Sequence, residues 1–296
     1  MAARGPGITE DMQYRPFGQT GTEVARIGQG SWNIPERGPA ADGAKRALLR
    51  GVELGMTHID TAEMYGDGRA EELIGEAIRE GKLRRENLFI VSKVLPSNST
   101  YAGTLRACER SLKRLGVDYL DCYLLHWRGS QPLSETMRAL EKLVDDGKTR
   151  ALGVSNFDLE DLEEAKAALE RHTLACNQVL YHLQERGIEH RVQPWCEKNQ
   201  VAVVAYTPFG RSPLPAESTP RGRVLADVAR KHGVTVRAVV LAFLTRYPNV
   251  FTIPKASTIP HVEENATAGD VNLDSDDVSQ IEEAFPRSRS TALRML

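Results

Sequence analysis

The sequence lacks a strong excess of charge of either sign. Its 296 residues include 38 lysines and arginines against 40 aspartates and glutamates, which gives a formal net charge of −2. Proteins that bind nucleic acids or anionic membrane surfaces usually carry a marked basic excess. We therefore expect a small-molecule ligand, with neither nucleic acid nor a membrane as a partner.

Long apolar runs and cysteine pairs are also missing. No stretch approaches the ~18 consecutive apolar residues of a membrane helix, and the first residues show no signal-peptide core, which predicts a cytoplasmic protein. The four cysteines, Cys108, Cys122, Cys176 and Cys196, form no C-x-x-C pair. We expect buried, inert thiols rather than disulfides or a metal site.

A complete dinucleotide-binding fingerprint is absent as well. Gly28 and Gly30 follow a predicted strand, but Asn33 stands where G-x-G-x-x-G has its third glycine. A doubly wound open sheet would normally carry that fingerprint after its first strand. The sequence therefore disfavours that architecture, and we interpret the two glycines as close packing at a strand end.

What the chain does contain is a regular alternation of short apolar runs and amphipathic stretches. A β-hairpin with its turn at residues 19–22 is followed by predicted strands at 25–30, 56–60, 87–93, 119–127, 149–157, 175–182, 201–209 and 249–255. Helices are predicted at 43–55, 70–81, 104–116, 134–147, 159–172 and 188–199, with two more between 221 and 247 and one at 275–285.

Eight buried strands joined by helical crossovers predict an α/β fold, a single (β/α)8 TIM barrel over residues 1–296 with the hairpin capping one end. We expect residues 286–296 to form a mobile tail or a loose cover over the site.

Polar side chains stand where the predicted strands end. Asp60 ends the second strand, Lys93 the third and His126 the fourth, and Tyr65 lies in the loop after the second. A single polar residue at such a place is usually only solvated. In a (β/α)8 barrel, however, the carboxyl ends of the strands meet at one rim, so we expect these four side chains to converge.

Together the four residues predict carbonyl reduction. A tyrosine with a pKa of about 10 is a poor acid near neutrality, but the ammonium of Lys93 can stabilise its phenolate. Asp60 can supply the counter-charge, and His126 can hydrogen-bond a carbonyl oxygen as negative charge develops there.

Two other reactions have less support. Hydrolysis by a serine triad would need an exposed nucleophile, and the chain has no G-x-S-x-G elbow. A metal bound by Asp60 and His126 is not backed by H-E-x-x-H or by any clustered ligand motif, so we expect no metal.

A set of short motifs occurs in a fixed order along the chain: HIDTAEMYG at 58–66, VSK at 91–93, LHW at 125–127, GVSNF at 153–157, NQ at 177–178 and IPK at 253–255. In these motifs the sequence resembles the aldo-keto reductase superfamily, its bacterial members in particular, from Tyr14 to about Phe285. The resemblance implies a (β/α)8 barrel that binds NADPH and transfers a hydride to an aldehyde or ketone. It implies Asp60, Tyr65, Lys93 and His126 as the catalytic residues.

The resemblance also implies a set of cofactor-binding residues. They are Ser155, Asn156, Gln178, Tyr206, Thr207, Phe209, Lys255, Ser257, His261, Glu264 and Asn265. Ser155, Asn156 and Gln178 would hold the carboxamide, and Tyr206 would stack on the nicotinamide. Lys255 and Ser257 would bind the 2′-phosphate, and Glu264 with Asn265 the adenine.

One position departs from the family pattern. His261 stands where many members have an arginine, and histidine is a weaker, pH-dependent partner for a phosphate. NADPH is the expected cofactor, with NADH as the alternative.

The substrate pocket is less constrained by sequence. Trp32 and Trp127 stand at positions of pocket walls in the family, although each could simply pack under a loop. The short loop at 211–215 predicts an open pocket with broad specificity. A cofactor-binding regulatory subunit, like the β-subunits of potassium channels, is the second hypothesis, and a monomer is the expected state.

Overall fold

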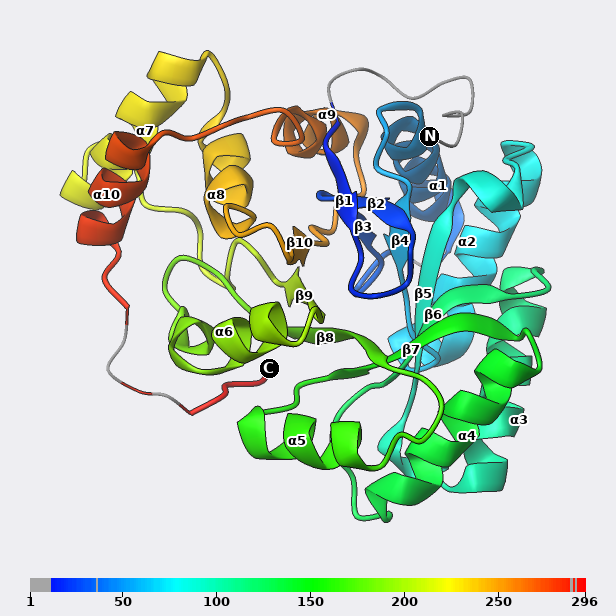
Figure 1. Ribbon diagram of the computed structural model, residues 1–296. Coiled ribbons are helices and arrows are strands. Elements are labelled where there is room, and N and C mark those ends of the chain that lie inside the picture. Colours follow the sequence, from blue (N-terminus) through cyan, green and yellow to red (C-terminus); the bar gives the residue numbers. More distant parts are fainter. Residues whose placement is uncertain (1–11, 36, 288–289, 291) are drawn as a thin grey trace.

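The computed structural model of the chain describes residues 12–35, 37–287, 290 and 292–296. Eight parallel strands form one sheet in the order β10-β9-β8-β7-β6-β5-β4-β3 (Figure 1). They are β3 (Gln29–Gly30), β4 (His58–Asp60), β5 (Phe89–Val94), β6 (Leu120–Leu125), β7 (Thr149–Ser155), β8 (Leu174–Leu180), β9 (Ala202–Tyr206) and β10 (Val250–Thr252).

Hydrogen bonds join the first strand to the last and so close the barrel. The amide of Gly28 donates to the carbonyl of Thr252 at 2.7 Å, and the amide of Thr252 donates to the carbonyl of Arg26 at 3.0 Å. Parallel bridges pair Ile27 with Thr252 and Gly30 with Lys255. The predicted (β/α)8 barrel is confirmed.

Close backbone contacts explain the two glycines of the incomplete fingerprint. A Cβ on Gly30 would lie 2.5 Å from the carbonyl oxygen of Ile253, and one on Gly28 would lie 2.7 Å from that of His58. Neither position has room for a side chain. Their interpretation as close packing at a strand end is confirmed.

The predicted hairpin is present and plugs the amino end of the barrel. β1 (Tyr14–Pro16) pairs antiparallel with β2 (Glu23–Ala25). Phe17, in the connection, is fully buried, and its ring centroid lies 4.8 Å from that of Phe89 and 5.8 Å from that of His58. An aromatic contact thus fixes the hairpin to the starts of β4 and β5.

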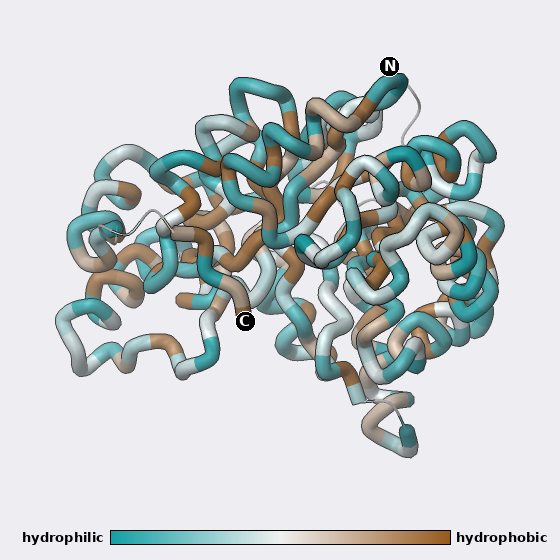
Figure 2. The backbone as a smooth tube through the Cα atoms, turned by 90° about the horizontal axis from the view of Figure 1, so that it is seen from below, coloured by the Kyte–Doolittle hydropathy of each residue, from teal (hydrophilic) through white to brown (hydrophobic). Residues whose placement is uncertain are grey.

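Ten α-helices surround the strands in the part of the chain that is described. They are α1 (Gly38–Glu53), α2 (Arg69–Glu80), α3 (Tyr101–Leu115), α4 (Leu133–Asp145), α5 (Leu159–Ala167), α6 (Val192–Lys198), α7 (Pro220–His232), α8 (Val236–Leu244), α9 (Ile259–Thr267) and α10 (Ser275–Ala284). Short 3₁₀ turns are η1 (Tyr65–Gly68), η2 (Arg85–Asn87), η3 (Pro96–Asn98) and η4 (Gly187–His190). In Figure 2 the hydrophobic segments of the tube alternate with hydrophilic ones along these helices, as expected for elements with one buried face.

Three helices differ most from the prediction. α1 begins at Gly38 rather than residue 43, because Pro39 in its first turn has the φ angle of a helix and lacks an N–H that would need a partner there. α5 ends at Ala167 rather than residue 172, since Glu141 accepts the backbone amides of residues 170–172 and holds them as a loop. α9 was not predicted, because few of its residues are apolar and buried.

The cysteine prediction can be compared with the core. Cys108, Cys122, Cys176 and Cys196 are all buried and free. Burial raises the pKa of Cys108 to about 12, which keeps the thiol protonated and unreactive. No described helix is both long enough and apolar enough to cross a membrane.

Candidate active site

Successive strand ends bring the four predicted catalytic residues together. Lys93 in β5 donates from Nζ to Asp60 Oδ1 at 2.6 Å, to the carbonyl of Thr61 at 2.8 Å and to the hydroxyl of Tyr65 at 3.2 Å. Tyr65 begins η1, in the loop after β4. The phenol, the ammonium and the carboxylate therefore form one hydrogen-bonded chain.

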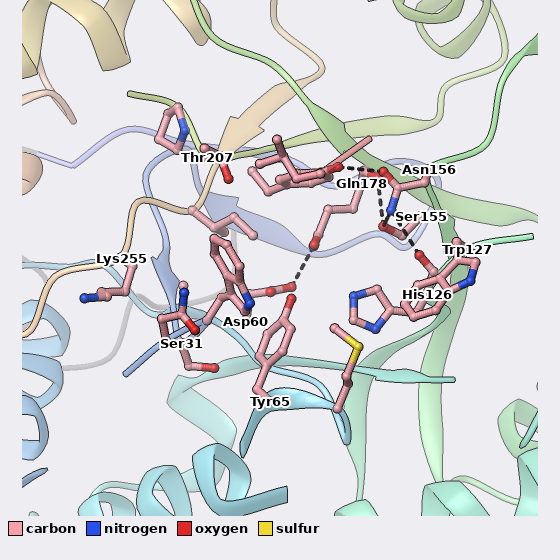
Figure 3. A pocket seen from close by; sticks show the side chains of 18 of the residues that line it. Ser31, Asp60, Tyr65, His126, Trp127, Ser155, Asn156, Gln178, Thr207 and Lys255 are labelled. Carbon is pink, nitrogen blue, oxygen red and sulfur yellow. Dashed lines mark hydrogen bonds between the residues drawn. The ribbon is translucent and has the colours of Figure 1, made fainter. Parts of the chain in front are cut away.

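Asp60 and Lys93 form a buried ion pair beneath the site. The second oxygen of Asp60 accepts from Gln178 Nε2 at 2.7 Å (Figure 3), so, together with the bond from Lys93, both carboxylate oxygens have a donor. Burial alone would lower the pKa of Lys93, but Asp60 and Tyr65 raise it above its ordinary value. The lysine stays charged, and its position is fixed by three acceptors.

Tyr65 and His126 face each other across the site. Their ring centroids lie 5.6 Å apart with an edge-on angle of 75°. Burial raises the pKa of Tyr65 overall, although Lys93 acts in the opposite direction. The lysine stabilises the phenolate as the sequence predicts, but burial is the larger effect on the pKa of Tyr65, and the charge of Asp60 adds to it. Tyr65 is thus protonated at neutral pH, the form that donates a proton.

The imidazole of His126 is neutral. Burial, with a smaller contribution from the charge of Lys93, lowers its pKa to about 2. Its Nδ1 is buried and has no hydrogen-bond partner among the described residues. A neutral imidazole still has one N–H to offer to an acceptor such as a carbonyl oxygen.

A cavity of about 390 Å³ opens above these residues (Figure 3). Most of the predicted site residues line it: Trp32, Asp60, Tyr65, His126, Trp127, Ser155, Asn156, Gln178, Tyr206, Thr207, Phe209 and Lys255. Lys93 lies beneath the cavity and is fully buried.

One wall of the cavity is an ordered polar surface. The hydroxyl of Tyr206 donates to Asn156 Oδ1 at 2.8 Å, and Asn156 Nδ2 donates to the carbonyl of His126 at 3.2 Å. Asn156 and Thr207 have positive φ angles of 61° and 53°. For a β-branched residue such as Thr207 this conformation is costly, and such strain is common at binding sites. The wall combines a flat ring with amide groups, which suits a nicotinamide carboxamide.

The remaining predicted cofactor residues do not line this cavity. Ser257, His261, Glu264 and Asn265 lie just before α9 or within it. Ser257 Oγ and Asn265 Oδ1 are buried without a hydrogen-bond partner in the described part of the chain. Lys255 is exposed and forms no ion pair with any of the described residues. These unpaired polar groups fit the adenosine and 2′-phosphate end of NADPH.

Some lining residues were not predicted. They are Gly30, Ser31, Asn33, Met64, Pro208, Gly210, Ile253 and Leu296. Leu296 belongs to the tail that follows α10, and its place in the lining agrees with the expectation of a cover over the site, although the residue itself was not named. Leu293 packs against the core, Arg294 pairs with Glu185 at 3.2 Å and Leu296 lines the cavity, so the described tail residues run back to the site; the C label in Figure 1 marks this end of the chain. No local sequence pattern records such a long-range path.

Metal binding has no structural support in the described residues. No group of three or more histidine, cysteine, aspartate or glutamate side chains there could hold a metal ion.

Sequence comparison decides the family. Residues 26–285 match the profile of the Aldo/keto reductase family. The chain belongs to this family. It is 42% identical to methylglyoxal reductase YeaE of Escherichia coli, over 91% of this chain and 94% of that protein. It is 36% identical to a glyoxal reductase of Bacillus subtilis, over 88% and 89% of the two chains.

Solved structures of the family agree. An aldo-keto reductase from Klebsiella pneumoniae in complex with NADPH superimposes with a TM-score of 0.87 at 42% identity, covering 96% of this chain and 99% of the other. The predicted family and the predicted enzyme class, an oxidoreductase, are thereby confirmed for this aldo-keto reductase.

Proposed function

We propose that this aldo-keto reductase uses NADPH to reduce small aldehydes and ketones, α-oxoaldehydes such as methylglyoxal above all, with Tyr65 as the proton donor. The observation that carries the proposal is the hydrogen-bonded chain from Asp60 through Lys93 to the hydroxyl of Tyr65 at the floor of the cavity. The names of two relatives, a methylglyoxal reductase and a glyoxal reductase, support the substrate class. The NADPH-bound relative and the unpaired polar groups near α9 support the cofactor.

Each residue has a distinct part in the reaction. NADPH, when bound, supplies the hydride that the carbonyl carbon receives. Tyr65 donates its proton to the carbonyl oxygen, and His126 orients that oxygen through its remaining N–H. Lys93 stabilises the phenolate that Tyr65 becomes, and Asp60 with Gln178 holds Lys93 in place.

The walls of the cavity favour a small substrate. Trp32, Met64 and Trp127 line it together with Leu296, so much of the surface beside the reacting groups is apolar. The nicotinamide, facing Tyr206, Asn156 and Gln178, would take up part of the 390 Å³ cavity. The space that remains suits a short carbonyl compound, and we expect acceptance of several small aldehydes rather than one.

The first prediction concerns Tyr65→Phe. Removing the hydroxyl takes away the proton donor but keeps the ring, so kcat for methylglyoxal should fall by about 10²–10⁴-fold while NADPH binding stays unchanged. NADPH oxidation followed at the nicotinamide absorbance gives the first quantity and quenching of tryptophan fluorescence gives the second. Retained turnover in the variant would remove Tyr65 from the chemistry.

The same assay distinguishes the enzyme from the second candidate function, a cofactor-binding regulatory subunit. A regulatory subunit would bind NADPH tightly and turn over no aldehyde even in the wild type. The complete set of Asp60, Tyr65, Lys93 and His126 favours the enzyme. We further propose that the protein acts as a monomer in the cytoplasm; sedimentation and cell fractionation test those two statements.

A further inference from the structure

Position 261 leaves a gap at the adenosine end of the site. The side chain of His261 is 58% exposed, and its Nδ1 lies 3.1 Å from Glu264 Oε2. An imidazole offers neither the flat fork of donors nor the permanent charge of a guanidinium. Position 261 therefore provides no guanidinium to this part of the site.

Arg237 places a guanidinium beside this position. It lies near the start of α8, which packs against α9 (Figure 1). Its Cζ lies 3.7 Å from the centroid of the Phe209 ring, and its Nε lies 3.5 Å from Glu264 Oε2. Phe209 lines the main cavity, so Arg237 connects that cavity with α9.

The partners of Arg237 are few for a residue so covered. Its side chain is 28% exposed, yet its Nε is buried with no hydrogen-bond partner in the described part of the chain. Burial lowers its pKa, and Glu264 only partly offsets this. A guanidinium has five N–H donors, so the ion pair with Glu264 at 3.5 Å leaves donors on this covered group whose contacts a ligand can complete.

The surroundings suit a purine. A guanidinium stacked on an aromatic ring still has a second flat face, and such faces bind aromatic bases. Glu264 and the unpaired Oδ1 of the buried Asn265 are acceptors of the kind that an exocyclic amino group needs. An extended dinucleotide whose nicotinamide lies at Tyr206 would run past Phe209 toward these groups.

We propose that Arg237, which lies over the ring of Phe209, is the stacking platform for the adenine of the cofactor. The inference rests on the proposed use of a nicotinamide cofactor. It concerns the adenine, which NADPH and NADH share, and not the 2′-phosphate.

The test is cofactor binding without turnover. Dissociation constants for NADP⁺, NAD⁺ and AMP are measured by calorimetry on the wild type, Arg237→Ala and Arg237→Lys. All three ligands should bind about tenfold more weakly to both variants, because a lysine keeps the charge but not the flat face. Arg230→Ala, which removes an exposed arginine on α7, is the matched control and should bind like the wild type.

Other outcomes overturn the inference. Unchanged affinities in both variants would show that Arg237 does not touch the cofactor. A loss confined to NADP⁺ and restored by Arg237→Lys would mean that the residue binds the 2′-phosphate as a point charge. A wild type that binds none of the ligands would refute the proposed function itself. If the wild type binds them and Arg237→Ala binds them with the same dissociation constants, only this inference is refuted. Thermal melting of each variant shows that it is folded.

Discussion

The ion pair between Lys93 and Asp60 has almost no exposed surface. The two side chains are 0% and 1% exposed, with 2.6 Å between Nζ and Oδ1. Removing one member of such a pair leaves the other charged group buried and uncompensated, which is far more costly than removing both. The site is therefore also a point on which the stability of the fold depends.

A prediction follows for Lys93→Met. The free energy of unfolding should fall by about 3–5 kcal/mol, since Asp60 would keep only its hydrogen bond from Gln178. The double variant Lys93→Met/Asp60→Asn should recover a large part of that loss. Urea denaturation of the wild type, the single variant and the double variant measures both effects. If Lys93→Met is as stable as the wild type, the ion pair does not contribute to stability as proposed.

His58 is a second buried group whose charge matters, this time at low pH. Its ring lies against Phe17 and Phe89, both of its nitrogens lack hydrogen-bond partners in the described residues, and Lys93 is the charged group that acts on it. Burial lowers the pKa of His58 to about 3 from an ordinary 6.5. Between these two values the unfolded chain binds one proton more than the folded chain, so stability falls as the pH falls.

The corresponding prediction concerns the pH slope of stability. Each such histidine contributes a loss of about 1.4 kcal/mol per pH unit below its unfolded pKa. His58→Leu should therefore lower the slope by about that amount between roughly pH 6 and pH 4, while the contribution of His126 remains. Urea denaturation at several pH values gives the slopes, and identical slopes would show that folded His58 takes up its proton normally.

At the residue scale the sequence predicts which proposed catalytic side chains come together better than it predicts their surroundings. Asp60, Lys93 and His126 could be found because each ends a strand, a local feature. The higher pKa of Tyr65 could not, because it depends on burial by distant segments. Arg237 was missed for a similar reason: its relation to Phe209 and Glu264 exists only once α8 and α9 are packed.

Among the elements, β3 and the residue that follows β10 come into close backbone contact where the barrel closes. β3 is only Gln29–Gly30, and the Cβ position of Gly30 lies 2.5 Å from the carbonyl oxygen of Ile253. Any side chain at residue 30 must push the strands apart where the barrel closes.

We expect Gly30→Ala to destabilise the protein by about 1–3 kcal/mol, since a well-packed backbone contact cannot absorb a methyl group. Gly43→Ala is the matched control. Gly43 lies in α1 with no close neighbour, its nearest contacts being 3.8 Å and 3.9 Å away, and alanine there should stabilise by about 0.5–1 kcal/mol. Thermal melting of both variants measures the two effects. Equal melting temperatures for Gly30→Ala and Gly43→Ala would show that the backbone near residue 30 can shift to accommodate a methyl group.

Element type was predicted well from sequence, and element ends less well. The strands and most helices follow from apolar periodicity, which the barrel imposes on every repeat. The end of α5 could not be predicted, because it is set by Glu141 from α4 through hydrogen bonds to the amides of residues 170–172. α9 could not either, because its polar face carries predicted cofactor residues and leaves little apolar pattern.

At the scale of the whole molecule, the tail after α10 completes the substrate cavity. Leu296 lines the cavity, while neighbouring Met295 is 56% exposed and does not line it. Leu296→Ala should raise KM for methylglyoxal by roughly tenfold and admit bulkier aromatic aldehydes, because a wall of the pocket is removed. Met295→Ala is the control, and steady-state kinetics over an aldehyde panel measures both. Equal KM values would place Leu296 outside the working pocket.

The chain also divides its site into two consecutive parts. Asp60, Tyr65, Lys93 and His126 all come from β4 through the end of β6, whereas the residues proposed to hold the cofactor begin at Ser155 in β7 and end at Asn265 in α9. The hydrogen bonds from Gln178 to Asp60 and from Asn156 to His126 join the two parts. A genetic crossover between the codons for β6 and β7 would therefore inherit the chemistry from one parent and the cofactor preference from the other. Evolution can therefore change the proposed cofactor preference without altering the residues proposed to carry the chemistry.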